Sequence, residues 1–176
     1  INCEGIPLNK ITSIKHYVNT WGLSSNKWFA ENIISKMANL DSIDLSNSIE
    51  ARHRSDVGRG IEAILEATAG LKIKNVNVNK NGMDEDGAKY IKEFLETTPT
   101  FKVLKASDCK LSDASCTIFD KALRKGQPKL KEIDLSHNNI SGNGFKTLFN
   151  GVSSLNSIEI VNVSSNITEA EDDGLI

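Results

Sequence analysis

The stretch LKEIDLSHNNI, residues 130–140, combines apolar residues at fixed spacings with an asparagine near its end. Ile133 and Leu135 are separated by one residue, and side chains in a β-strand change face at every residue. They therefore predict a short strand with one apolar face. The full stretch fits the template L-x-x-L-x-L-x-x-N/C-x-L, with Leu130, Asn138 and Ile140 in the outer positions.

Four further segments repeat this order along the chain. They start at residues 40, 73, 101 and 158 and read LDSIDLSNSIE, IKNVNVNKNGM, FKVLKASDCKL and IEIVNVSSNIT. With the start at 130, the successive intervals are 33, 28, 29 and 28 residues. The first copy has Ser48 and Glu50 in its last two positions, and the last copy ends in Thr168. Matches that recur at so regular an interval indicate leucine-rich repeats.

The asparagine or cysteine position follows the strand at the point where the chain turns away. A side-chain amide there can pair with backbone groups that would otherwise be buried without partners. Cys109 occupies this position in one repeat, so we interpret it as a structural residue. Cys116 falls on the apolar face of the next helical segment, and we interpret it in the same way.

Helical segments follow the strands. Apolar residues recur at spacings of three and four in residues 84–95, 112–123 and 141–152, which predicts helices with one apolar face. Because helices are wider than strands, the stack is expected to curve into an open horseshoe segment, with a parallel sheet inside and helices outside. The predicted fold class is an α/β leucine-rich-repeat solenoid with long, ribonuclease-inhibitor-like repeats.

The repeats divide the chain into three parts. Residues 1–39 are predicted to form an N-terminal helical cap, because the ends of a repeat stack need covering. Residues 40–168 carry the repeats. Residues 169–176 are predicted to be an acidic, disordered tail.

Composition excludes several classes of function. The chain has 176 residues, a net charge of −2 and a pI near 6.0, which gives no reason to expect nucleic acid as a partner. No apolar run approaches the roughly 20 residues that a membrane span needs. The three cysteines form no C-x-x-C pair, which favours a reduced chain and a cytoplasmic location. The histidines lie in unrelated repeats, so neither a metal nor a cofactor is expected, and the chain is not expected to be an enzyme by itself.

A basic segment, SIEARHRSDVGRG at residues 48–60, coincides with the one lengthened interval. The extra residues are expected in the first loop between a strand and its helix, a place where repeat proteins often carry function. Arg52 and Arg54 then have two interpretations. They keep a surface loop soluble, or they form an electropositive contact for an acidic or phosphate-bearing partner.

The segment KWFAENIISKMANLDSIDLSNSIEARHRSDVGRGIEAILEA, residues 27–67, resembles the N-terminal part of Ran GTPase-activating proteins. The opening EGIPLNKITS and the later segment at residues 107–136 are also similar to that family. The resemblance implies binding to GTP-bound Ran through the loops at one rim, promotion of GTP hydrolysis by that partner, and a role in nucleocytoplasmic transport near the nuclear envelope.

The resemblance also implies partner-binding residues. Arg52 falls at the position of the family's loop arginine, and Asp108 at the position of its asparagine in the third rim loop. Arg54, Asn79 and Lys80 are expected to support them. The alternative is a non-catalytic protein-interaction module or adaptor without activator function, comparable to the short repeat domains of tropomodulin-like actin regulators.

Overall fold

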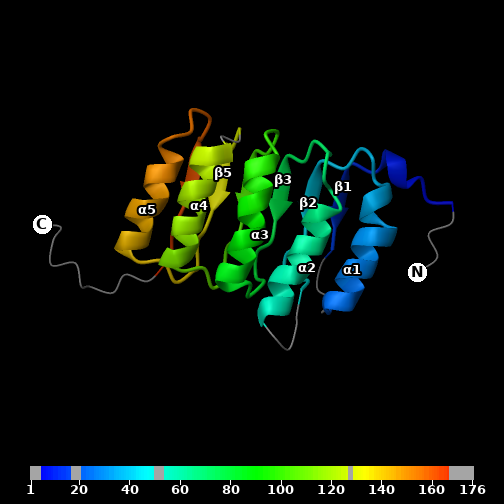
Figure 1. The fold of residues 1–176 in the computed structure, drawn as a ribbon, viewed down its shortest axis with the longest axis horizontal. Helices are drawn as coiled ribbons and strands as arrows, with labels where there is room; N and C mark the ends of the chain where they lie inside the picture. The colour runs from blue at the N-terminus through cyan, green and yellow to red at the C-terminus, as the bar shows by residue number, and fades with distance from the viewer. Residues whose placement is uncertain (1–4, 17–20, 50–53, 127–128, 167–176) are drawn as a thin grey trace, which may run out of the picture.

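Six short strands lie side by side in chain order and form one parallel sheet, with a helix after each of the first five (Figure 1). This computed structural model describes residues 5–16, 21–49, 54–126 and 129–166. The strands are β1 (Ser13–Lys15), β2 (Ser42–Asp44), β3 (Asn75–Asn77), β4 (Val103–Lys105), β5 (Glu132–Asp134) and β6 (Ile160–Asn162). The helices are α1 (Leu23–Asn32), α2 (Arg54–Glu66), α3 (Asp84–Thr97), α4 (Asp113–Gly126) and α5 (Gly142–Val152), with two short 3-10 helices, η1 (Leu8–Lys10) and η2 (Ile34–Lys36).

The strands pair in the register that the repeat spacing predicts. Ile43 pairs with Val76, Val76 with Leu104, and so on to Val161 in β6. Each of α1 to α4 packs against the helix that follows it. The helices cover one face of the sheet and leave the other face open (Figure 1). The predicted leucine-rich-repeat solenoid is thus confirmed.

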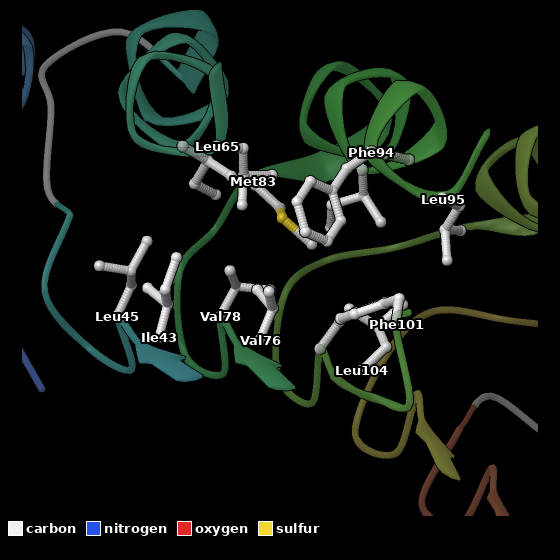
Figure 2. Packing of buried hydrophobic residues seen from close by; sticks show 14 of the residues in the cluster. Ile43, Leu45, Leu65, Val76, Val78, Met83, Phe94, Leu95, Phe101 and Leu104 are labelled. Atoms are coloured by element: carbon white, nitrogen blue, oxygen red, sulfur yellow. The ribbon is translucent and has the colours of Figure 1, made fainter. Parts of the chain in front are cut away.

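The core fills the space between the sheet and the helices. In β2 to β5 the middle residue is buried and both flanking residues are half-buried, because alternate side chains point to opposite faces. Figure 2 shows Val76 and Val78 on the strand side facing Met83 and Phe94 on the helix side. Burying one such side chain stabilises a fold by about 1.5–3 kcal/mol, so one strand–helix repeat contributes several such increments.

Buried amides connect neighbouring repeats. Asn138 Oδ1 accepts the backbone N–H groups of Cys109 and Leu111 at 2.9 and 3.0 Å, and its Nδ2 donates to the carbonyl of Ala106 at 2.9 Å. Asn81 makes the same kind of bridge to the preceding repeat. The predicted role of this position, to satisfy backbone groups where the chain turns, is confirmed.

The predicted helical cap at residues 1–39 is wrong over Ser13–Lys15, which form β1 and extend the sheet by one strand. The main-chain N–H of His16 donates to the Asp44 carbonyl at 2.7 Å, so pairing with β2 satisfies this backbone. Residues 11–21 keep Ile11, Ile14 and Asn19 of the repeat template and depart from it at His16, which fills the second apolar position of the strand. α1 agrees with the helical part of the prediction. The predicted tail at residues 169–176 lies outside the described residues.

The extra length of the 33-residue interval is divided between two edges of the sheet. The connection from β2 to α2, residues 45–53, is longer than that from β3 to α3, residues 78–83. The connection from α2 to β3, residues 67–74, is also longer than that from α3 to β4, residues 98–102. The expectation of a single enlarged loop is therefore only partly right.

The GRG sequence at residues 58–60 lies inside α2. A Cβ atom on Gly58 would stand 3.1 Å from the backbone nitrogen of Gly87 in α3. A Cβ atom on Gly60 would stand 3.1 Å from the side chain of Asn26 in α1. The two glycines therefore allow α2 to pack closely against the helices on both sides.

Candidate protein-binding rim

The strand-to-helix loops lie along one edge of the sheet, which we call the rim: residues 45–49, 78–83, 106–112, 135–141 and 163–166 (Figure 1). Each rim loop places an exposed residue in the left-handed backbone region at an equivalent position, with φ between 51° and 59°; the loop 106–112 has a second one, Lys110, with φ 61°. None of the five is glycine. The residues are Asn47, Lys80, Asp108, His137 and Ser165.

At four of these five positions the left-handed backbone is held by hydrogen bonds between repeats. The N–H of Lys80 donates to the carbonyl of Ser107 at 2.8 Å, and the N–H of Asp108 donates to the carbonyl of Ser136 at 3.1 Å. Asn47 and His137 make the equivalent bonds. A left-handed backbone costs a non-glycine residue about 1–2 kcal/mol, so the surrounding structure must hold it in place. The rim is thus a fixed row of exposed side chains, about 4.8 Å apart from strand to strand.

In four of the five rim loops, the turn that leads to this position is fixed by the last strand residue. Asp44 Oδ1 accepts the N–H of Ser46 at 2.9 Å, and Asp134 Oδ1 accepts the N–H of Ser136 at 3.0 Å. Lys105 stands at this place in β4 and has no acceptor oxygen. There Asn79, from the preceding repeat, accepts the N–H of Ser107 at 2.8 Å.

The structure brings three of the five predicted site residues together. Lys80 and Asp108 occupy equivalent positions in neighbouring repeats, and both are exposed. Neither forms a salt bridge with another described residue. Asn79 precedes Lys80 and is half-buried, with its side-chain oxygen already used within the fold.

The structure describes only part of the two predicted arginines. Arg52 lies outside the described residues. Arg54 is the first residue of α2, which places its backbone at the rim, and its side chain lies outside the described part.

Three further rim residues are exposed in the same row and were not singled out from the sequence. Asn47 precedes Lys80 along the rim, and His137 and Ser165 follow Asp108. Counting repeats would have found all three, because each occupies the position just before the asparagine or cysteine slot, or its Ser48 equivalent.

The open face of the sheet adjoins the rim and is polar. Lys15 pairs with Asp44 at 3.3 Å, and Lys105 pairs with Glu132 at 3.3 Å. Burial raises the pKa of Asp44, but hydrogen bonds from Ser46 together with the Lys15 ammonium hold the pKa below its usual value. A shallow hollow of about 340 Å³ lies over β2 to β5 between the two ion pairs. This face offers polar contacts to a partner.

The cysteines take no part in this surface. Cys109 Sγ donates to the carbonyl of Val78 at 3.2 Å, in the slot between two repeats. Burial raises the pKa of both Cys109 and Cys116 to about 12. Both are buried free thiols, which supports the structural interpretation.

Two classes of feature are absent from the described part of the chain. No group of three or more histidine, cysteine, aspartate or glutamate side chains in that part is arranged to hold a metal ion. Likewise, none of the helices there has the length and hydropathy of a membrane-spanning segment.

Comparison with known proteins supports the repeat assignment. A family model described as leucine-rich repeat matches residues 126–149, which contain β5 and most of α5. This is the repeat next to the predicted site residue Asp108.

Two solved structures have a similar fold. The C-terminal domain of tropomodulin from Caenorhabditis elegans aligns with a TM-score of 0.62 at 16% identity, over 81% of this chain and 82% of that one. The actin-binding site 2 of leiomodin-1 aligns with a TM-score of 0.53 at 18% identity, over 58% of this chain and 60% of that one. At these identities the likeness shows the fold alone. The resemblance to Ran GTPase-activating proteins remains a prediction.

Proposed function

We propose that this chain is a non-catalytic protein-binding module that contacts its partner through the rim. The observation that carries the proposal is the row of exposed side chains on a left-handed backbone, repeated in consecutive strand–helix units. Hydrogen bonds between repeats already hold most of these residues in place. Binding of a partner here therefore costs this chain little conformational entropy. Preorganised and strained positions of this kind often belong to binding surfaces.

Charge along the rim supplies specificity. The exposed Lys80 and Asp108 are one repeat apart and carry opposite charges. A partner must therefore present an acidic and a basic group at about the strand spacing, and a partner with like charges would be repelled. His137, next along the rim, adds a group that both donates and accepts hydrogen bonds when neutral.

The first partner class that we propose is an actin-like protein. The similar leiomodin-1 structure is named for an actin-binding site, and the adaptor alternative from the sequence points to the same class. This assignment transfers a property from a structural neighbour, so it needs a direct binding measurement.

The second partner class is a GTP-bound GTPase of the Ran type. Its specific support is that the fold brings Asn79, Lys80 and Asp108 to adjacent places on the rim and begins α2 at Arg54 on the same edge. An aspartate at position 108 can accept a hydrogen bond from a glutamine amide of the GTPase. Promotion of GTP hydrolysis would require that contact.

One experiment tests the module and distinguishes the partners. Binding of the whole chain to monomeric actin, to GTP-loaded Ran and to GDP-loaded Ran is measured by surface plasmon resonance. The double variant Lys80→Glu/Asp108→Lys keeps the net charge and reverses the order of charges on the rim. We expect it to weaken binding by about tenfold or more, because two charge contacts are reversed.

The matched control is Lys121→Glu on the exposed surface of α4, which should leave the affinity unchanged within about twofold. Unchanged affinity of the rim variant would refute the rim as the binding surface. The rate of GTP hydrolysis by Ran is measured in parallel, with and without the chain. Acceleration that Arg52→Ala abolishes supports the activator function, whereas actin binding that survives Arg52→Ala supports the adaptor function.

A further inference from the structure

A groove of about 560 Å³ lies between α2 and α3, at the edge of the sheet opposite the rim. The turn that follows α2 closes one end of it, with Gly70 at a φ of +83°. This turn belongs to the longer helix-to-strand connection described above. Residues 68–72 of this longer connection line the groove.

The floor of the groove is apolar and well packed. Leu65 and Phe94 line it and are each only 6–7% exposed. The Phe94 ring packs edge-on against Phe101 with centroids 5.0 Å apart, and Thr68 donates its hydroxyl to the Leu65 carbonyl at 2.6 Å. A floor fixed in this way can accept an apolar side chain without rearrangement.

The walls of the groove are acidic. Glu62 and Glu66 line it from α2, and Glu93 lines it from α3. Burial, followed by the charges of Glu66 and Glu93, raises the pKa of Glu62. Burial, and then the charge of Glu62, raises the pKa of Tyr90, which lines the groove from α3.

The described cations of α2 and α3 form their salt bridges with carboxylates outside the groove walls, although the charge of Arg59 also acts to lower the pKa of Glu62. Arg59 pairs with Asp56 at 3.7 Å, Lys89 with Asp86 at 2.8 Å, and Lys92 with Glu96 at 3.8 Å. Among the described residues, no salt bridge involves any of the three carboxylates of the groove walls. Lys72 is the one cation among the lining residues that the structure describes. The groove thus combines an apolar floor with an excess of negative charge.

We infer that this groove is a second docking surface, which takes a short basic peptide segment of a partner protein with an arginine beside an apolar residue. The apolar residue contacts Leu65 and Phe94. The guanidinium lies against the wall carboxylates, where it forms paired hydrogen bonds with a carboxylate and relieves the mutual repulsion of Glu62, Glu66 and Glu93. The volume is in the range of pockets that hold a ligand of this size.

The test uses a fluorescein-labelled peptide, Leu-Arg-Leu-Arg-Leu, and a control peptide in which both arginines are glutamate. Fluorescence anisotropy with the full chain should show binding of the first peptide only. Glu62→Gln/Glu93→Gln removes two wall charges and should weaken binding by about tenfold. Glu31→Gln makes the same kind of change at an exposed position of α1 and should have no effect.

A second measurement keeps the result independent of variant stability. Amide chemical shifts of the wild-type chain are recorded with and without the peptide, and the changes should fall on residues 62–72 and 90–100. Equal affinity for both peptides, changes confined to the rim or the open face, or binding of spermine in place of the peptide would overturn the inference. Because the groove and the rim share none of these residues, failure here leaves the proposed function untouched, and the reverse also holds.

Discussion

Asn79 Oδ1 accepts a hydrogen bond from the backbone N–H of Ser107, 2.8 Å away in the next repeat. In the loops after β2, β3 and β5, the acceptor of the corresponding hydrogen bond is the side-chain oxygen of an aspartate or asparagine in the same repeat. Lys105 holds the equivalent place in β4, and its side chain has no oxygen to accept this hydrogen bond. A residue that the sequence marks for partner binding therefore also holds the loop of Asp108.

The first prediction separates these two roles of Asn79. Asn79→Ala should lower the free energy of unfolding by about 1 kcal/mol, because it removes the acceptor for Ser107 N–H. Asn79→Asp keeps an acceptor oxygen at this place and should retain most of the stability. Urea denaturation of the two variants measures the difference. Equal loss in both would show that the oxygen does not stabilise the loop.

The second prediction concerns the buried amide of Asn138. Asn138→Ala leaves the N–H groups of Cys109 and Leu111 without their acceptor and should cost about 3 kcal/mol. The neighbouring Asn139 is exposed, so Asn139→Ala should change stability by less than about 0.5 kcal/mol. The midpoints of urea unfolding test both. Similar midpoints for the two variants would contradict the bridging role.

The third prediction concerns the close packing at Gly144 in α5. A Cβ atom there would stand 2.7 Å from Ile140 Cγ2 and would also overlap the Asp113 carboxylate, which accepts a hydrogen bond from Ser141 N–H. Gly144→Ala should therefore destabilise the chain, although alanine is the better helix former by about 1 kcal/mol.

Gly22 is the control for this change. It precedes α1 with a φ of −71°, and a Cβ atom added to it would have no neighbour within 4 Å. Gly22→Ser adds a good N-cap residue and should leave the Tm unchanged or slightly raised. Thermal unfolding by circular dichroism compares the two. A Gly144→Ala variant as stable as the wild type would refute the packing argument.

The fourth prediction follows from the raised pKa of Glu62, which is due to burial and then to the charges of Glu66 and Glu93. A carboxyl whose pKa is higher in the folded state keeps its proton there after the unfolded chain has released it. Its contribution to stability is therefore lost as the pH rises above 4.5, the usual pKa of a glutamate side chain.

Glu62→Gln should consequently raise the Tm at pH 7, and the difference from the wild type should shrink at pH 4. Differential scanning calorimetry at both pH values tests this, with Glu31→Gln as the control for net charge. A lowered Tm at pH 7 would mean that the Glu62 carboxylate is stabilised in the fold.

The fifth prediction concerns the thiols of Cys109 and Cys116. Burial raises the pKa of both to about 12, and the thiolate is the reactive form. Iodoacetamide at pH 8 should leave both unmodified in the native chain and modify both in urea. Peptide mapping by mass spectrometry identifies the modified residues. Rapid native labelling of Cys109 would show that its slot opens.

The sequence predicts the register of β2 to β6 because each repeat carries the same apolar spacing. Ile43, Val76 and Leu104 occupy one template position, and the fold places them in register. β1 belongs to a weaker copy of the same template, residues 11–21, which keeps Ile11, Ile14 and Asn19 but has His16 where Leu45 stands in the next repeat. Its pairing with β2 places Ile14 in register with Ile43, at the same template position.

Of the two candidate sites, the rim can be predicted from the sequence and the acidic groove cannot. Counting repeats is enough to place Lys80 beside Asp108, because equivalent positions of adjacent repeats are neighbours in space. The acidic groove is not predictable in this manner. Glu62 and Glu66 are four residues apart on one helix, but their approach to Glu93 depends on how α2 and α3 pack and on the turn after α2.

The left-handed position in each rim loop separates the identity of the exposed side chain from the stability of the scaffold. In four of the five loops its conformation is held by main-chain hydrogen bonds to the next repeat, and the five loops carry asparagine, lysine, aspartate, histidine and serine there. Selection can therefore exchange these residues one at a time and change what the protein recognises without redesigning its interior. Gain or loss of a whole repeat would lengthen or shorten the recognition surface by one such residue.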